Sequence, residues 1–164
     1  MRGQRFNLGV GGGRKRFNIL GAYCPQDQEY IDVRQAGGTI SYTHVVELLE
    51  KLQKKHPDVT VFVLHLDNAR YQHARKLKEW IAAKQQTEGI TFVLEHVPPY
   101  SPNLNLIERL WKLLRKHALR TWHDTFEAMQ MAIAKVLDNL ADYADELQSL
   151  MTEKFRICPV ADCK

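Results

Sequence analysis

The pattern of apolar and polar positions predicts a β-hairpin at the start of the chain, followed by an amphipathic helix. An apolar, β-prone run covers residues 17–23, the turn-rich stretch CPQDQ follows, and YIDVRQ then alternates as a partner strand does. The helix should end near His56 and Pro57, because the residue before a proline is disfavoured in the helical conformation. Its apolar residues recur at helical spacing and are Val45, Leu48, Leu49 and Leu52.

A strand, a helix and a second strand are predicted next. Residues 59–66, VTVFVLHL, form a nearly unbroken apolar run, which is typical of a strand buried on both faces of a sheet with parallel members. A helix is expected from about Tyr71 to Gln86, and the next strand begins at Ile90. The apolar stripe of that helix consists of Ala74, Leu77, Trp80 and Ile81.

The remainder of the chain is predicted to be helical. One helix follows the turn-rich PPYSPN stretch at 98–103, and Asp124 with Glu127 three residues later forms a capping-box arrangement that predicts the start of another. The apolar positions of the first helix are Ile107, Leu110, Trp111 and Leu114. Those of the second are Phe126, Met129, Ile133, Val136 and Leu140, and Tyr143, Leu147 and Leu150 extend a helical tail.

Composition fits one folded domain with a weak preference for polyanions. The 164 residues are about the size of a single domain, and with 45% apolar and 26% charged residues the chain is too apolar to be disordered. The formal charge of +4 and the pI near 9.0 only tilt the odds toward a polyanionic partner. The positions of the basic residues must therefore decide.

Cysteine usage and hydropathy favour the cytoplasm. Cys24, Cys158 and Cys163 are odd in number and widely spaced, which suits free thiols in a reducing compartment. No second Cys/His pair accompanies Cys158 and Cys163, which disfavours a zinc site. The apolar runs fall far short of the ~20 residues that span a bilayer, and the N-terminus lacks an apolar signal core. We therefore expect a cytoplasmic protein without a membrane partner.

Two carboxylates stand where ion ligands are commonly placed. Asp67 directly follows the buried strand, at the edge where open α/β sheets form their ligand crevices. Glu108 lies in the first turns of a helix that begins after a proline-stiffened turn, which fixes the direction of its carboxylate. Each has a plainer alternative. Asp67 could cap the following helix, and Glu108 could pair with Lys112 on the surface for about 0.3–0.5 kcal/mol.

The stretches LHLDNARYQHARKLKEWI and VPPYSPNLNLIERLWKLLRK resemble the second and third catalytic blocks of DDE transposases. The resemblance is to the mariner-related superfamily, particularly its bacterial insertion sequence 630 branch. The shared pattern is a strand ending in Asp-Asn-Ala, a histidine a few residues on, PPYSP, an asparagine, and Ile-Glu-Arg-x-Trp. A weaker similarity runs upstream through GGGRKRFNILGAY, so the resemblance covers most of residues 1 to about 140.

This resemblance implies an RNase H-like α/β fold, in which a mixed sheet is flanked by helices. It implies that Asp67 is the second catalytic aspartate and Glu108 the third acidic residue, and that both bind metal. The family's chemistry uses DNA and two divalent ions about 3.5–4 Å apart, for which Mg²⁺ or Mn²⁺ is expected here. The surrounding motif positions are matched by Asn68, His73, Tyr100, Pro102 and Asn105.

The superfamily's first catalytic aspartate has no counterpart in this sequence. In the family it lies just before the segment that GQRFNLGV resembles, and neither Asp27 nor Asp32 corresponds to it. The family's first strand lies between the hairpin and the strand ending at Asp67. Its absence should open the sheet and leave buried backbone groups unpaired, at ~1–3 kcal/mol each. The chain would then borrow a strand, recruit residues 4–10 or be marginally stable, and we expect little or no strand transfer by the chain alone.

We therefore expect residues 1–140 to form an N-terminally incomplete catalytic domain and residues 141–164 to form a C-terminal helical tail. The family's N-terminal helix-turn-helix domain has no counterpart either. The expected partners are DNA and either a second copy of the chain or a complementing N-terminal fragment.

Two groups of basic residues could contact DNA phosphates, which would make binding sensitive to salt. A charged face that is merely solvated is the alternative for both groups. The first group, in the glycine-rich segment, is Arg14, Lys15 and Arg16. The second, along the helix after the PPYSP turn, is Arg109, Lys112, Arg115, Lys116 and Arg120.

Three functions compete for this sequence. The first is an enzyme, or enzyme fragment, that attacks phosphorus in DNA. The second is a non-catalytic remnant of the same fold that binds DNA or oligomerises. The third is an unrelated α/β domain, which would require Asp67 and Glu108 to lie more than about 10 Å apart, because carboxylates that share an ion pair must approach it closely.

Overall fold

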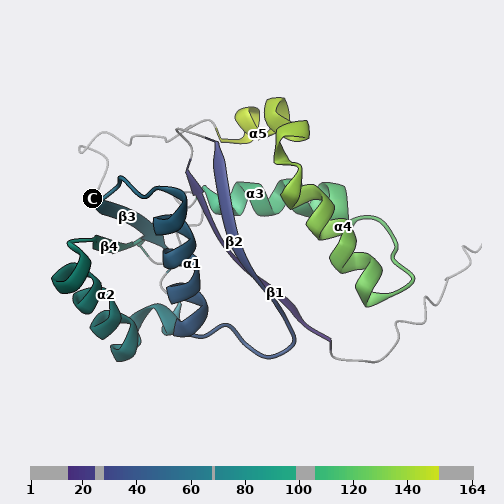
Figure 1. Cartoon of the computed structure of the whole chain (residues 1–164). Helices are drawn as coiled ribbons and strands as arrows, with labels where there is room; N and C mark the ends of the chain where they lie inside the picture. Colours follow the sequence, from purple (N-terminus) through teal and green to yellow (C-terminus); the bar gives the residue numbers. More distant parts are fainter. Residues whose placement is uncertain (1–14, 25–27, 68, 99–105, 152–164) are drawn as a thin grey trace, which may run out of the picture.

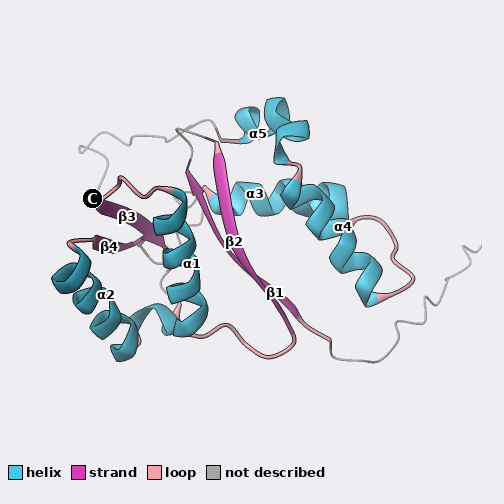
Figure 2. Cartoon of the chain, in the orientation of Figure 1, coloured by secondary structure: helices cyan, strands magenta, loops and turns pink. Residues whose placement is uncertain are grey.

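The computed structural model describes residues 15–24, 28–67, 69–98 and 106–151. The first half contains β1 (Phe17–Cys24), β2 (Glu29–Ala36), α1 (Tyr42–Lys55), β3 (Val61–Leu66) and the short 3₁₀ turn η1 (Arg70–His73). The second half contains α2 (Arg75–Glu88), β4 (Thr91–His96), α3 (Ile107–Leu114), the π-helical turn η3 (Arg115–Leu119), α4 (Phe126–Asp138), the 3₁₀ turn η4 (Leu140–Tyr143) and α5 (Ala144–Leu150). Mixed α/β architecture is thereby confirmed (Figure 2). No helix in these ranges is long and apolar enough to cross a membrane.

The strands form two separate two-stranded sheets. β1 and β2 pair as an antiparallel hairpin in which Phe17 lies opposite Ala36 and Cys24 lies opposite Glu29. β3 and β4 pair in parallel, with Val61 beside Thr91. The single mixed sheet that the resemblance implied is not observed in the described ranges, because no described strand pairs with the second edge of β1 or of β3.

Two apolar cores lie on opposite faces of the hairpin. In one, α3, α4 and α5 pack together and receive Phe17 and Ile19 from β1. In the other, α1 and α2 pack on the β3/β4 sheet and receive Leu20 from the opposite face of β1. Figure 1 shows the hairpin between α1 and the helices α3 and α4. The hairpin therefore connects the two cores through alternate side chains of one strand.

β3 is covered on one face, which corrects the prediction of a strand buried on both. Phe62 and Leu64 pack toward α1 and α2, whereas Val61 and Val63 are 56% and 54% exposed. Val93 on β4 is also exposed on this open face. Helices α3 to α5 do not cover these valines, because they pack with the hairpin in the other core.

Two predicted helix starts are wrong, one because of local hydrogen bonds and the other because of the backbone conformation before the helix. α4 is capped by Thr125, whose hydroxyl accepts from the Ala128 N–H, whereas the Asp124 carboxylate accepts from the Trp122 indole. α2 begins at Arg75 rather than Tyr71, because Ala74 has an extended backbone (ψ 133°) after η1. The predicted end of α1 near His56 and the helical tail through Leu150 are confirmed.

The hairpin is packed tightly at Gly21, where a side chain has no room. A Cβ at this position would lie 2.7 Å from the Tyr30 ring, and the Tyr30 hydroxyl also donates to Asp32. Burial and the Asp32 carboxylate raise the pKa of Tyr30, so the phenol stays protonated and this hydrogen bond persists at neutral pH.

Gly21→Ala is therefore expected to lower the free energy of unfolding by about 1–3 kcal/mol, measured by urea denaturation. Tyr30→Leu removes the ring, so adding Gly21→Ala in that background should cost much less. Tyr30→Phe keeps the clashing ring carbon and should give no such relief. An equal loss of unfolding free energy from Gly21→Ala in the unsubstituted chain and in the Tyr30→Leu variant would contradict this packing.

Candidate active site

Asp67 directly follows β3, and its carboxylate is tied down on one side. Asp67 Oδ1 accepts from the buried amide of Gln72 (2.7 Å to Nε2) and from the Ala69 backbone N–H (3.3 Å). Both donors belong to the turn that leads through η1 into α2. The residue as a whole is exposed, and Oδ2 receives no hydrogen bond from the described residues. Oδ2 is thus the oxygen of Asp67 that no described residue engages.

Two histidines lie beside Asp67. His73 ends η1 and His96 ends β4, and their ring centroids are 4.3 Å apart. Partial burial and the neighbouring His73 lower the pKa of His96, although Asp67 acts in the opposite direction. Burial, and secondarily Asp67, raise the pKa of Tyr71. The carboxyl ends of β3 and β4 therefore gather Asp67, His73 and His96 at one edge of the parallel pair, where ligand crevices form.

Glu108 is carried by the other core. It lies in the first turn of α3, whose buried Leu110, Leu113 and Leu114 anchor the helix against α4 and α5. The side chain is half-buried and makes no ion pair with Lys112, so the surface pair considered as an alternative is not formed. Asp67 and Glu108 therefore lie on elements of different cores.

The described side chains fit divalent cations as individual ligands but do not form a closed cage. The uncommitted oxygen of Asp67 and the carboxylate of Glu108 are hard donors of the kind that Mg²⁺ prefers. Within the described ranges, no group of three His, Cys, Asp or Glu side chains converges so as to hold a metal. His73 and His96 pack against each other as tilted rings, with 31° between their planes.

A comparison with known families identifies the family of the chain. A profile described as DDE superfamily endonuclease matches residues 1–130, more than three quarters of the chain. This chain belongs to the DDE superfamily endonucleases. The match includes both Asp67 and Glu108 and supports DNA as the substrate class. No curated protein and no solved structure matches the chain.

The basic side chains of the chain divide into those that join elements of the fold and those without an ion pair to a described acidic residue. Arg109 donates to the Leu150 carbonyl (2.9 Å), Lys116 pairs with Glu146 (2.9 Å), and Lys15 pairs with Glu127 (3.2 Å). These contacts use the cations to join elements of the fold. By contrast, among the basic residues predicted to contact DNA, those that are exposed and make no ion pair with a described acidic residue are Arg16, Lys112, Arg115 and Arg120.

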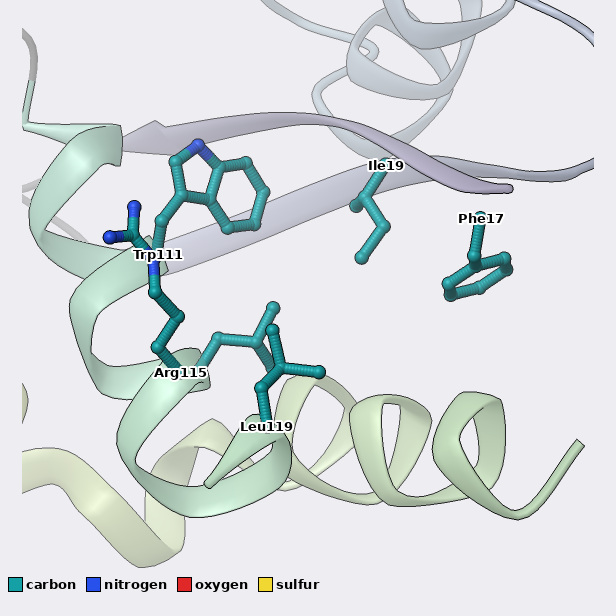
Figure 3. A pocket seen from close by; sticks show the side chains of 6 residues that line it. Phe17, Ile19, Trp111, Arg115 and Leu119 are labelled. Carbon is teal, nitrogen blue, oxygen red and sulfur yellow. The ribbon is translucent and has the colours of Figure 1, made fainter. Parts of the chain in front are cut away.

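An open hollow of about 240 Å³ lies between β1 and the α3/η3 segment (Figure 3). Its lining is mostly apolar, with Phe17 and Ile19 from the strand and Trp111 and Leu119 from the helical side. Arg115 is the cation in this lining. The lining of the hollow includes neither Asp67 nor Glu108, the candidate catalytic carboxylates.

Several residues with a predicted role lie outside the residues that the structure describes, and their roles stay predictions. These are Arg14, Asn68, Tyr100, Pro102 and Asn105, together with Asp27, Cys158, Cys163 and residues 4–10.

The sequence did not point to Gln72 or His96. Gln72 donates a hydrogen bond to Asp67, and His96 lies near enough for Asp67 to act on its pKa. Gln72 stands among polar residues in the run ARYQH, where nothing marks one side chain as buried. His96 becomes a neighbour only through the pairing of Leu66 with His96 in the parallel sheet. Counting the register of the two predicted strands could have suggested His96, but no sequence signal distinguished Gln72.

Proposed function

We propose that this chain is the catalytic portion of a transposase similar to the insertion sequence 630 branch, and that it cuts and joins DNA ends with Asp67 and Glu108 as ion ligands. The observation that carries the proposal is the exposed carboxylate of Asp67, which follows a parallel strand with Oδ1 hydrogen-bonded to Gln72 and Ala69. The family match to DDE endonucleases supports it, and phosphoryl transfer is the reaction proposed.

Divalent cations, Mg²⁺ or Mn²⁺, would supply charge neutralisation at the attacking and leaving oxygens of the phosphodiester. The chain's own contribution is to hold two anionic side chains on separate, well-packed elements. β3 and η1 fix Asp67, and the buried face of α3 fixes Glu108. We propose that Lys112 and Arg115, one and two turns along α3 and η3 from Glu108, bind DNA phosphates.

A complete site needs a further carboxylate, which we propose comes from a strand that neither sheet contains here. The open edges of β1 and β3 and the exposed Val61 and Val63 are where such a strand would pair and be covered. A complementing N-terminal fragment would provide this carboxylate, whereas a second copy of the chain would add only a strand, because it has the same sequence. On this proposal the 164 residues alone have little or no strand-transfer activity.

The second candidate function is a non-catalytic remnant that binds DNA or oligomerises. The absence of a three-ligand metal cluster among the described residues and the exposed valines of β3 favour it. The two candidates differ in their requirement for the carboxylates, because a remnant would bind DNA equally well with or without divalent cations.

The shared ion site can be tested directly by NMR with Mn²⁺, whose unpaired electrons broaden signals of nearby nuclei. If Asp67 and Glu108 share an ion, Mn²⁺ should broaden the amide signals of both Ala69 and Arg109. Glu108→Gln should weaken the broadening at Ala69, and Asp67→Asn should weaken that at Arg109. Broadening confined to one of the two segments would contradict the proposal and favour the remnant.

The exposed cations of α3 and η3 should contribute directly to DNA affinity. Lys112→Gln and Arg115→Gln are each expected to weaken DNA binding and to lower the salt slope, the dependence of log K on log salt, by about one. Arg109→Gln on the same helix is the matched control, because Arg109 already donates to Leu150. It should lower thermal stability and leave the salt slope unchanged. Fluorescence anisotropy at several salt concentrations measures all three, and a larger slope change for Arg109→Gln than for the other two would contradict the assignment.

A further inference from the structure

Gln72 is the sole polar side chain classed as buried within the described ranges, with 4% of its surface exposed. It lies in the short turn η1, between the end of β3 and the start of α2. A buried amide that lost its partners would leave both a donor and an acceptor unsatisfied, which is unfavourable in a protein interior. The partners that satisfy Gln72 therefore need a physical account.

Those partners determine the orientation of the amide. Gln72 Oε1 accepts from the Ala69 N–H at 2.9 Å, and Gln72 Nε2 donates to Asp67 Oδ1 at 2.7 Å. A backbone N–H can only donate and an ionised carboxylate can only accept, so the reverse orientation of the amide would break both contacts. Asp67, Ala69 and Gln72 thus form a closed set, since Ala69 N–H also reaches Asp67 Oδ1.

The two hydrogen bonds of the Gln72 amide act on different groups. The bond from Ala69 N–H to Gln72 Oε1 lies within the start of η1. The bond from Nε2 instead constrains Asp67, because a charge-assisted hydrogen bond to Oδ1 stops the carboxylate from rotating freely. With Oδ1 held by Gln72, Oδ2 is the oxygen that accepts no hydrogen bond from a described residue at the carboxyl end of β3.

We propose that Gln72 is a positioning residue that orients the Asp67 carboxylate for a divalent cation. It touches neither cation nor DNA, and acts by fixing which oxygen of Asp67 is offered. Partners of this kind around an ion ligand commonly change ion affinity by about 10-fold to 100-fold when removed. The cation part of this inference rests on the proposed function, whereas the orientation of Asp67 stands on the hydrogen bonds alone.

The orientation is tested by a double-mutant cycle in thermal unfolding of the full 164-residue chain. Gln72→Glu keeps the acceptor for Ala69 N–H but sets two carboxylates against each other, so the unfolding midpoint should fall. Adding Asp67→Asn restores a donor and an acceptor with their roles exchanged, and the midpoint should recover. Gln86→Glu, the same change on an exposed position of α2, is the matched control and should have little effect. A midpoint for the double variant no higher than that of Gln72→Glu would overturn the orientation.

The cation role is tested with Gln72→Met, a neutral replacement of similar volume, at a temperature where circular dichroism shows the variant folded. Titration with Mn²⁺, followed at the Ala69 amide, should give a dissociation constant raised about 10-fold or more, with Gln86→Met unchanged. An unchanged dissociation constant in Gln72→Met would show that Gln72 only builds the turn and would overturn the inference. If the unsubstituted chain showed no Mn²⁺ effect, the proposed function and the cation role would both fail, and the cycle would still decide the orientation.

Discussion

Asp67→Asn and Glu108→Gln are each expected to lower Mg²⁺-dependent nicking of transposon-end DNA by roughly 100-fold or more. Both substitutions replace an anionic oxygen by a neutral amide of the same shape, which removes most of the attraction for a hard divalent cation. The measurement is gel analysis of a labelled duplex, with the chain supplied together with an upstream segment that carries an aspartate-bearing strand. The 164 residues alone should show little or no nicking.

Matched controls separate this loss from general damage. Asp124→Asn changes a carboxylate that only accepts from the Trp122 indole, and Glu79→Gln changes one that only pairs with Arg75 on the surface of α2. Neither should alter nicking more than about twofold, since exposed pairs contribute little. Equal losses in controls and test variants, or full activity in Asp67→Asn, would remove Asp67 from the catalytic centre and leave the DNA-binding remnant as the better description.

The positions of Asp67 and Glu108 could be predicted because each depends on local sequence. An apolar run that ends in an acidic residue fixes a strand end, and a proline-rich stretch followed by periodic leucines fixes a helix start. What surrounds Asp67 could not be predicted in this way. His96 lies near it through the register of β3 and β4, and Gln72 through a turn that interrupts the predicted helix at Ala74. Those contacts arise from strand pairing and local hydrogen bonding, which periodicity does not encode.

The extent of burial was also beyond the sequence. An unbroken apolar run shows that a strand can be buried on both faces, but whether Val61 and Val63 are covered depends on where distant helices pack. The leucines of α3 pack with side chains of α4 and of the hairpin, and Val61 and Val63 are not part of this core. The same exposed face is where the proposed complementing strand would matter, which links the incomplete burial to the incomplete catalytic site.

The largest expected loss of stability comes from the two cores. Leu110 and Leu49 are each 0% exposed, one in the α3/α4/α5 core and the other in the α1/α2 core. Replacing either by alanine deletes buried methyl groups and leaves a cavity, so each change should lower the free energy of unfolding by about 3–4 kcal/mol. Against a total of roughly 5–15 kcal/mol for a domain, either loss is severe. Val63→Ala on the exposed face is the control and should cost less than about 1 kcal/mol.

The double variant Leu49→Ala/Leu110→Ala tests whether the hairpin unites the two cores. Phe17 and Ile19 enter one core while Leu20 enters the other, so a single strand carries both packing surfaces. If this coupling makes the chain one cooperative unit, both single variants should unfold in one transition by circular dichroism and by tryptophan fluorescence, which reports Trp80 beside one core and Trp111 beside the other. The two losses should then add in the double variant, since the sites share no direct partner. Two separate transitions in either single variant would instead mean that the cores fold independently, and that the positions of Asp67 and Glu108 relative to each other depend on a further strand.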